Sequence, residues 1–184
     1  MSKPAVLISI RPEWVEKILS GEKKVEIRKR KPYFPAPFKC YIYCTKGGEE
    51  KWLAGVKGGR ESYKLNGTVC AEFTCDSIQN FSCPFPAYSK EVDQTILKDA
   101  CIAYVWAHLY LGHKSGCAWH ISDVKVYDKS KKITDFKRWN RTEENVPCAH
   151  VKSLYEPCET CTACNLKRPP QSWCYVEELE GNDK

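Results

Sequence analysis

The segment GEKKVEIRKRK, residues 21–31, combines six cationic side chains with two carboxylates. Lys23, Glu26 and Arg28 are spaced so that a turn followed by a strand would bring them to one face. Two cations beside a carboxylate can bind phosphate, with the carboxylate holding both cations in place. Alternatively, Glu26 acts as a general base on water while Lys23 or Arg28 stabilises an oxyanion. A solvated ion network at a strand edge, without any function, is the third interpretation.

The residues before this segment predict two short elements that would position it. Residues 5–10 form an apolar, β-branched run that is typical of a buried strand. Pro12 then stands at a first-turn position and Gly21 at a C-terminal cap position, which predicts a helix between them. The helix would return the chain to the start of the charged segment.

Residues 23–30 predict a strand with two unlike faces. Val25 and Ile27 would point to one side of it, and Glu26 and Arg28 to the other, because side chains alternate along a strand. Lys23 enters the strand just after the turn, close to the face that carries the two charged residues.

The remaining pattern favours one α+β domain spanning residues 1–184. A glycine- and charge-rich stretch, 46–66, predicts a surface loop or a long hairpin tip. Five or six short strands with two or three helices favour a small β-barrel decorated with helices over a parallel α/β sheet. Further strands are predicted at 38–45, 67–78, 117–128 and 171–179, and further helices at 89–100 and 103–113.

Composition narrows the class of protein and of partner. Of 184 residues, 42% are hydrophobic, which is enough for a packed core, and the net charge is +6. Residues 22–31 alone contribute +4, so the positive charge is localised, as a phosphate-backbone partner would favour. No apolar run is long enough to cross a bilayer, and the first residues lack the pattern of a secretory signal. We therefore expect a soluble, cytoplasmic protein without a membrane partner.

A resemblance to a known family starts from the pattern G-x-K-x-x-E-x-R. Gly21, Lys23, Glu26 and Arg28 fill it, directly after a strand and a proline-initiated helix, and this resembles the ASCH family of the PUA-like superfamily. The segments YIYCT, GTVCAEFTCD, CAWHISDVKVYD and RPPQSWCYVEEL are similar to its longer members, which phages or prophages often encode. The resemblance implies a PUA-like small β-barrel, here with a cysteine-rich insertion near its C-terminus, and a cleft lined by the motif.

The function that this resemblance implies is binding of RNA or of a modified nucleoside in a basic cleft. Lys23 and Arg28 would hold phosphate, and Glu26 would orient them. The alternative is a hydrolase acting on a nucleoside amide such as N4-acetylcytidine, or on RNA, with Lys23, Glu26 and Arg28 as its catalytic residues. The family branch with the amidase activity has threonine where this chain has Glu26, so this chain lacks that nucleophile. A phage-encoded factor that binds a host protein is a third possibility.

Other side chains are predicted to contribute to the same ligand site. Arg11 follows the first strand and is a further phosphate donor, while Gln171 and Ser172 offer an amide and a hydroxyl to a base edge. Aromatic rings beside a basic segment suit stacking on unpaired bases, although a ring in a small barrel more often belongs to the core. We expect one of four strand aromatics to face a ligand, with Tyr43 and Tyr175 as the candidates among Tyr41, Tyr43, Trp173 and Tyr175.

Cysteines form a second candidate site within the connector 146–168. Its C-x2-C-x2-C run can place three thiolates round one ion, which predicts a structural zinc site without a catalytic part. Free thiols, disulfides and an iron–sulfur cluster are the alternatives. The predicted ligands are Cys148, Cys158, Cys161 and Cys164, with His150 as the substitute fourth ligand. Six other cysteines lie within apolar runs and are predicted to be free thiols: Cys40, Cys44, Cys70, Cys75, Cys101 and Cys117.

Overall fold

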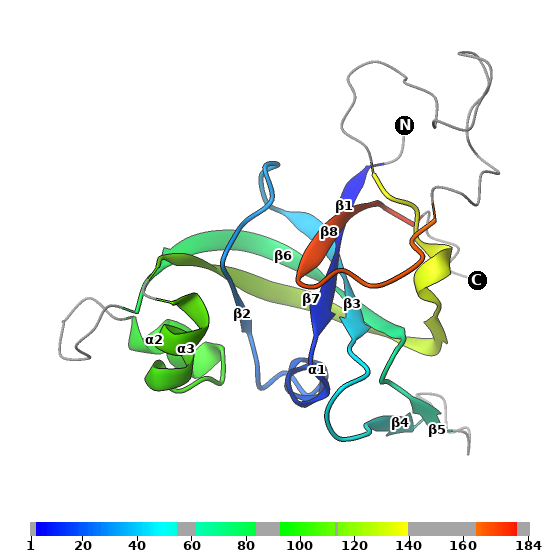
Figure 1. The fold of residues 1–184 in the computed structure, drawn as a ribbon, viewed down its shortest axis with the longest axis horizontal. Helices are drawn as coiled ribbons and strands as arrows, with labels where there is room; N and C mark the ends of the chain where they lie inside the picture. Colours follow the sequence, from blue (N-terminus) through cyan, green and yellow to red (C-terminus); the bar gives the residue numbers. More distant parts are fainter. Residues whose placement is uncertain (1–2, 55–61, 84–92, 113, 140–164, 180–184) are drawn as a thin grey trace, which may run out of the picture.

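A computed structural model describes residues 3–54, 62–83, 93–112, 114–139 and 165–179 (Figure 1). Its main sheet has six strands: β1 (Pro4–Ile10), β2 (Val25–Arg28), β3 (Phe38–Cys44), β6 (Val69–Phe81), β7 (Gly116–Lys131) and β8 (Trp173–Glu177). The helical elements are α1 (Pro12–Leu19), α2 (Gln94–Asp99), α3 (Tyr104–Leu111) and the short 3-10 helix η1 (Ile133–Asp135).

The sheet is open and does not close into a barrel, so the prediction of a small β-barrel is wrong in this respect. Strand order is β2-β7-β6-β3-β1-β8, with β1 and β3 parallel and the other neighbours antiparallel. The α+β class is confirmed, but β2 and β8 are edge strands that share no ladder. The strand β2 is only four residues long and makes all of its backbone pairs with β7. It therefore forms no ladder with β8, and the two edges of the sheet stay unpaired with each other.

The turn after α1 delivers the charged segment to the sheet as the sequence predicts. Pro12 begins the helix, where its missing N–H is not needed. Gly21 adopts a left-handed φ of 78°, a conformation that glycine reaches without a steric penalty. The Lys23 N–H then donates to the Lys17 carbonyl at 2.9 Å, which fixes the chain as it turns back toward β2.

Strand β2 is buried on both faces, which is why four consecutive residues are inaccessible. Val25 and Ile27 join an apolar cluster with residues of α2 and α3. Glu26 stands opposite Trp119 in the ladder with β7, and Trp119 belongs to the main core cluster. The predicted alternation is confirmed, but both faces of the strand are covered rather than one.

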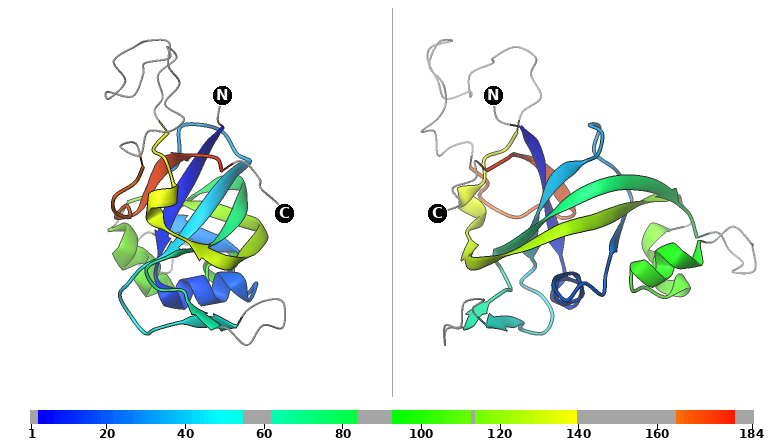
Figure 2. Two further views of the ribbon diagram at one scale, coloured as in Figure 1. Left: turned by 90° about the vertical axis from the view of Figure 1, so that its right-hand side faces the viewer. Right: turned by 180° about the vertical axis from the view of Figure 1, so that it is seen from behind.

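Two peripheral units extend from the sheet (Figure 2). The long strands β6 and β7 run side by side along the molecule, and the helices α2 and α3 lie together at one end of them. The range 46–66, predicted as a loop or hairpin tip, contains β4 (Trp52–Ala54) paired with β5 (Ser62–Lys64). Among the described helices, none has the length and hydrophobicity needed to span a membrane.

Candidate functional site

Lys23, Glu26 and Arg28 converge into one buried ion cluster. The Lys23 ammonium lies 3.3 Å from one oxygen of Glu26, and the Arg28 guanidinium lies 2.8 Å from the other. The three residues are 5%, 7% and 7% exposed, so the cluster belongs to the interior and not to a solvated face. Burial of one carboxylate between two cations requires further polar partners, since each charge has lost its hydration.

A backbone oxygen and an aromatic ring lie next to the Lys23 ammonium, besides Glu26. Its ammonium donates to the carbonyl of Ala100, just after α2, at 2.7 Å. It also lies 5.1 Å from the centre of the Trp14 ring, a cation–π contact. Lys23 therefore ties the helical unit and α1 to the start of β2.

Arg28 spans the gap between the two edges of the sheet. We call this gap the seam; it lies between β2 and the chain that runs from Ser172 into β8. One terminal nitrogen donates to the Ser9 carbonyl in β1 at 2.7 Å. The other lies 3.2 Å from the Ser172 hydroxyl and 3.5 Å from its carbonyl. A single side chain thus joins β2 to the paired β1 and β8 segments, with which β2 shares no backbone ladder.

An aromatic cluster lines the seam next to these contacts. Trp119, fully buried, lies 5.8 Å from Trp173, centre to centre, and Trp173 lies 5.2 Å from Tyr175. Tyr175 lies 4.8 Å from Tyr33, which is 45% exposed. The rings are therefore in continuous contact from Trp119, which stands opposite Glu26 of the ion cluster, to the surface at Tyr33. Phe34 and Trp139 contact this path, so the aromatic cluster comprises Tyr33, Phe34, Trp119, Trp139, Trp173 and Tyr175.

Two buried donors of this region have no hydrogen-bond partner among the described residues. They are Nε of Arg28 and Nε1 of Trp119. Such atoms carry a desolvation penalty that an acceptor would relieve. Both belong to side chains on the same face of the β2–β7 ladder, where Arg28 stands opposite Cys117 and Glu26 opposite Trp119.

The surface beside the ion cluster is positively charged. Lys29, Arg30 and Lys31 follow β2 directly and are exposed. Lys29 lies 5.3 Å from the centre of the Tyr110 ring on α3. Burial raises the pKa of Tyr110, and the charge of Arg28 opposes that rise, which places the phenol in the field of the ion cluster.

The other predicted ligand residues lie in different surroundings. Arg11 is exposed at the N-cap of α1, and Gln171 is exposed beside Ser172 in the seam. Tyr175 faces the seam as part of the aromatic cluster. Tyr43 is 3% exposed and belongs to a separate core cluster with Ala5, since it alternates with Ile42 and Cys44 along β3. It is a core residue in this fold.

The predicted zinc ligands Cys148, His150, Cys158, Cys161 and Cys164 lie outside the described residues, so the zinc site stays a prediction. Within the described parts of the chain, no group of three or more His, Cys, Asp or Glu residues could hold a metal ion. All six cysteines predicted as free thiols are free, and all but Cys101 are buried.

Sequence reasoning missed the outer part of the aromatic cluster. Tyr33 and Phe34 follow the basic run that ends at Lys31 after a single proline, Pro32, and Trp139 follows the Lys137-Arg138 pair. Aromatic residues interleaved with cations are typical of nucleic-acid-binding surfaces, and that pattern was the available signal. Their proximity to Tyr175 depends on pairing between distant segments.

Comparison with known proteins places the fold. No protein-family profile matches the sequence, and no curated protein matches it. A serine-to-alanine variant of ASCH from Zymomonas mobilis is 16% identical, over 95% of this chain and 89% of that chain, with a TM-score of 0.53. ASCH from Zymomonas mobilis and its tyrosine-to-phenylalanine variant are each 18% identical over 70% of this chain, covering 73% and 76% of those chains, with TM-scores of 0.48 and 0.47. The match over nearly the whole chain shows that this protein has the fold of an ASCH domain.

Proposed function

We propose that the chain binds single-stranded RNA, or a modified nucleoside within it, at the seam between β2 and β8. The observation that carries the proposal is the path of rings from Trp119 to the exposed Tyr33, adjoining three exposed cations. Unpaired bases stack on such rings, while neighbouring cations hold the phosphates. RNA is also the ligand that the resemblance to ASCH domains implies.

The burial of the ion cluster changes the roles that the sequence predicted. Lys23 and Arg28 already donate to carbonyl oxygens and contact Glu26. Their charged groups are therefore engaged within the protein and are unsuited to binding a phosphodiester. Lys29, Arg30 and Lys31 are exposed and take the phosphate role in this proposal. In this proposal the ion cluster holds β2 and β8 in their relative positions at the seam and does not contact the RNA.

Hydrolysis of a nucleoside amide or of RNA is the less favoured alternative. Lys23 and Glu26 are 3.3 Å apart, which is a suitable distance for a catalytic pair. However, the Lys23 ammonium donates to Ala100 and contacts Glu26, and Glu26 also contacts Arg28, so both groups are engaged with protein partners. Incubation with N4-acetylcytidine and with RNA, followed by chromatography, separates the alternatives. Product that forms with wild type and not with Glu26→Gln would favour the hydrolase.

The binding proposal is tested by fluorescence anisotropy with a short labelled single-stranded RNA. Tyr33→Leu should weaken binding by about 1 to 3 kcal/mol, the amount expected for one stacked base. Trp52→Leu removes a ring of similar exposure, 56%, from β4 and should leave affinity unchanged. Equal affinities for wild type and Tyr33→Leu would reject stacking at the seam.

Salt dependence tests the phosphate contacts separately. Replacing Lys29, Arg30 and Lys31 together by serine should reduce the slope of log affinity against log salt by about 2. A slope that does not change would show that these three cations do not contact the RNA backbone.

A further inference from the structure

The outer face of α3 carries apolar side chains that solvent reaches. Val105, Trp106, Leu109 and Tyr110 are 59%, 66%, 61% and 39% exposed. Their spacing of one, three and one residues puts them on one side of the helix, and we call this set the α3 face. The opposite side buries Ala107 and Leu111 against the cluster that contains Val25 and Ile27 of β2.

The whole of α3 has the composition of a buried helix. Its sequence, YVWAHLYL, holds no Asp, Glu, Lys or Arg, and both of its sides are apolar. A helix that is apolar on all sides is normally covered on all sides. Contiguous exposed apolar residues on a soluble domain mark an interaction site more often than scattered single ones do.

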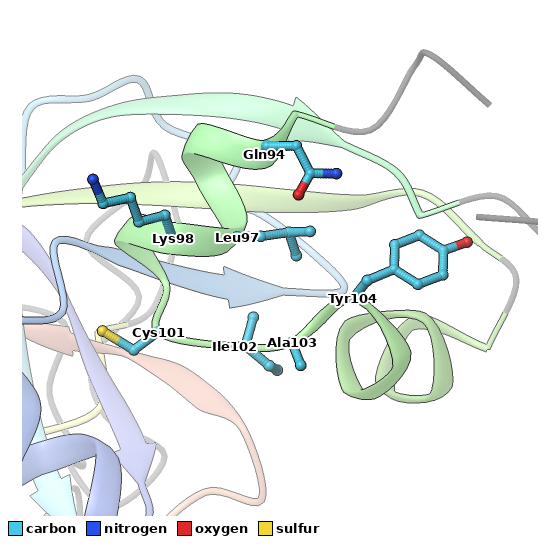
Figure 3. Close-up of a pocket in the computed structure, with 7 residues that line it drawn as sticks. All are labelled: Gln94, Leu97, Lys98, Cys101, Ile102, Ala103 and Tyr104. Atoms are coloured by element: carbon cyan, nitrogen blue, oxygen red, sulfur yellow. The ribbon is translucent and has the colours of Figure 1, made fainter. Parts of the chain in front are cut away.

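A pocket adjoins the α3 face where the helix begins (Figure 3). Its volume is about 370 Å³, and it is a shallow hollow that is open to solvent rather than an enclosed cavity. Ala103 and Tyr104 line it and stand directly before Val105, so pocket and α3 face are adjacent along the chain. Lys98 is the one charged residue among those lining it, which are Gln94, Leu97, Lys98, Cys101, Ile102, Ala103 and Tyr104.

Three exposed cations border this surface, and the carboxylates of Asp93 and Asp99 flank the pocket residues Gln94 and Lys98 in the sequence. Lys98 lines the pocket, Lys29 lies over the ring of Tyr110, and the exposed Lys114 follows the helix by three residues. An apolar surface with cations at its border complements an amphipathic segment with acidic residues beside its apolar ones.

We propose that the α3 face and its adjoining pocket bind an acidic, amphipathic helical segment of another protein. The apolar side of that segment covers Trp106 and Leu109, and one of its large side chains enters the pocket. Its acidic residues meet Lys29, Lys98 and Lys114. This surface shares Lys29 with the proposed RNA site but none of the rings of the aromatic cluster, so the inference goes beyond the proposed RNA binding.

RNA is a weaker candidate for this surface than a protein segment. Trp106 and Tyr110 offer rings, but Val105 and Leu109 on the same face are branched aliphatic side chains, on which a base cannot stack. The helix itself provides no cation for phosphate. Burial of aliphatic and aromatic side chains together is typical of the centre of a protein interface.

The probe is a labelled synthetic peptide with Leu and Phe at helical spacing and Glu at the remaining positions. Fluorescence anisotropy should show binding to wild type, and Trp106→Glu should weaken it about 30-fold or more, as expected for an interface anchor. Trp52→Glu makes the same change on β4 and should leave peptide affinity unchanged. A peptide with Lys in place of every Glu should bind less tightly than the Glu peptide, by an amount that salt reduces.

Each contrary outcome has a distinct meaning. If wild type does not bind the Glu peptide, or if Trp106→Glu binds it equally well, the proposal is overturned. If Trp106→Glu retains peptide binding but loses RNA binding, the α3 face belongs to the RNA site. If light scattering shows a wild-type dimer that Trp106→Glu converts to monomer, the occupant is a second copy. Normal circular dichroism and RNA affinity of Trp106→Glu, together with lost peptide binding, support the proposal independently of the seam.

Discussion

A terminal nitrogen of Arg28 in β2 donates a hydrogen bond of 2.7 Å to the backbone oxygen of Ser9 in β1. The two strands do not pair in the sheet, where β2 borders β7 and β1 lies between β3 and β8. The same guanidinium contacts Glu26 at 2.8 Å. A charged side chain therefore joins parts of the sheet that backbone pairing leaves separate, and the shape of the seam depends on it.

Arg28→Lys tests this bridge. Lysine keeps the positive charge near Glu26 but cannot direct two nitrogens at Ser9 and Ser172, so the seam loses hydrogen bonds. We expect the free energy of unfolding to fall by about 1.5 to 3 kcal/mol, the usual contribution of a hydrogen bond to a charged group. Hydrogen exchange should become faster in β8 than in the β6–β7 pair. Arg30→Lys, at an exposed position, is the control.

Glu26→Gln tests whether the carboxylate holds the ion cluster together. The amide keeps the shape of the side chain but leaves Lys23 and Arg28 as two buried cations without a counter-charge. Breaking a buried ion pair in this way typically costs about 3 to 5 kcal/mol. Urea denaturation measures the loss. Glu22→Gln, which removes an exposed partner of Lys17, should unfold at the same urea concentration as wild type.

Gly116→Ala tests the close approach of β7 to β2. A methyl group at this position would lie 2.8 Å from the backbone oxygen of Arg28, which cannot move without disturbing the β2–β7 ladder. We expect a loss of about 1 to 3 kcal/mol, as for overpacking elsewhere in protein interiors. Gly47→Ala is the matched control, since nothing lies within 4 Å of its added methyl. Equal thermal stability of the two variants would contradict the prediction.

The buried cysteines predict a loss of stability at alkaline pH. Burial raises the pKa of Cys44, Cys70 and Cys75 from 9.0 to about 12. The folded protein therefore favours the neutral thiols, and their contribution to stability is complete below pH 9 and is lost as pH rises toward 12. Each thiol should lower the free energy of unfolding by about 1.4 kcal/mol per pH unit in that interval.

Cys70→Ala provides the comparison for this pH dependence, because alanine does not titrate. Its free energy of unfolding, measured by urea denaturation from pH 8 upward, should fall less steeply with pH than that of wild type. The comparison concerns the slope, so a cavity left by the substitution does not affect it. Parallel slopes would show that ionisation of Cys70 in the unfolded chain makes no contribution.

Local sequence signals predicted the elements that carry the ion cluster. Pro12 and Gly21 mark the start of α1 and the turn after it, and the alternation in β2 places Glu26 and Arg28 on one face. The convergence of Lys23 with these two follows from the same short-range geometry. Such features depend on residues close in sequence, so the pattern was sufficient.

Long-range features of the site could not be predicted in the same way. Ser172 was a candidate, but its contact with Arg28 spans 144 residues, and no local pattern identifies Arg28 as its partner. Tyr33, Trp139 and Tyr175 likewise come together through separate segments. The open sheet depends on which edge strands find backbone partners, a property of the whole fold.

Arg28 and Ser172 lie 144 residues apart in the sequence, so the contact between them can form only late in synthesis of the chain. A ribosome releases the N-terminal residue of this contact long before the C-terminal one, and domains complete their packing only when all of their strands are available. Until Ser172 and β8 have left the ribosome, the nascent protein lacks the segment that borders its proposed RNA site opposite β2. Under the proposed function, incomplete translation products that stop before this residue would not bind RNA at the seam, even where their earlier strands have already paired.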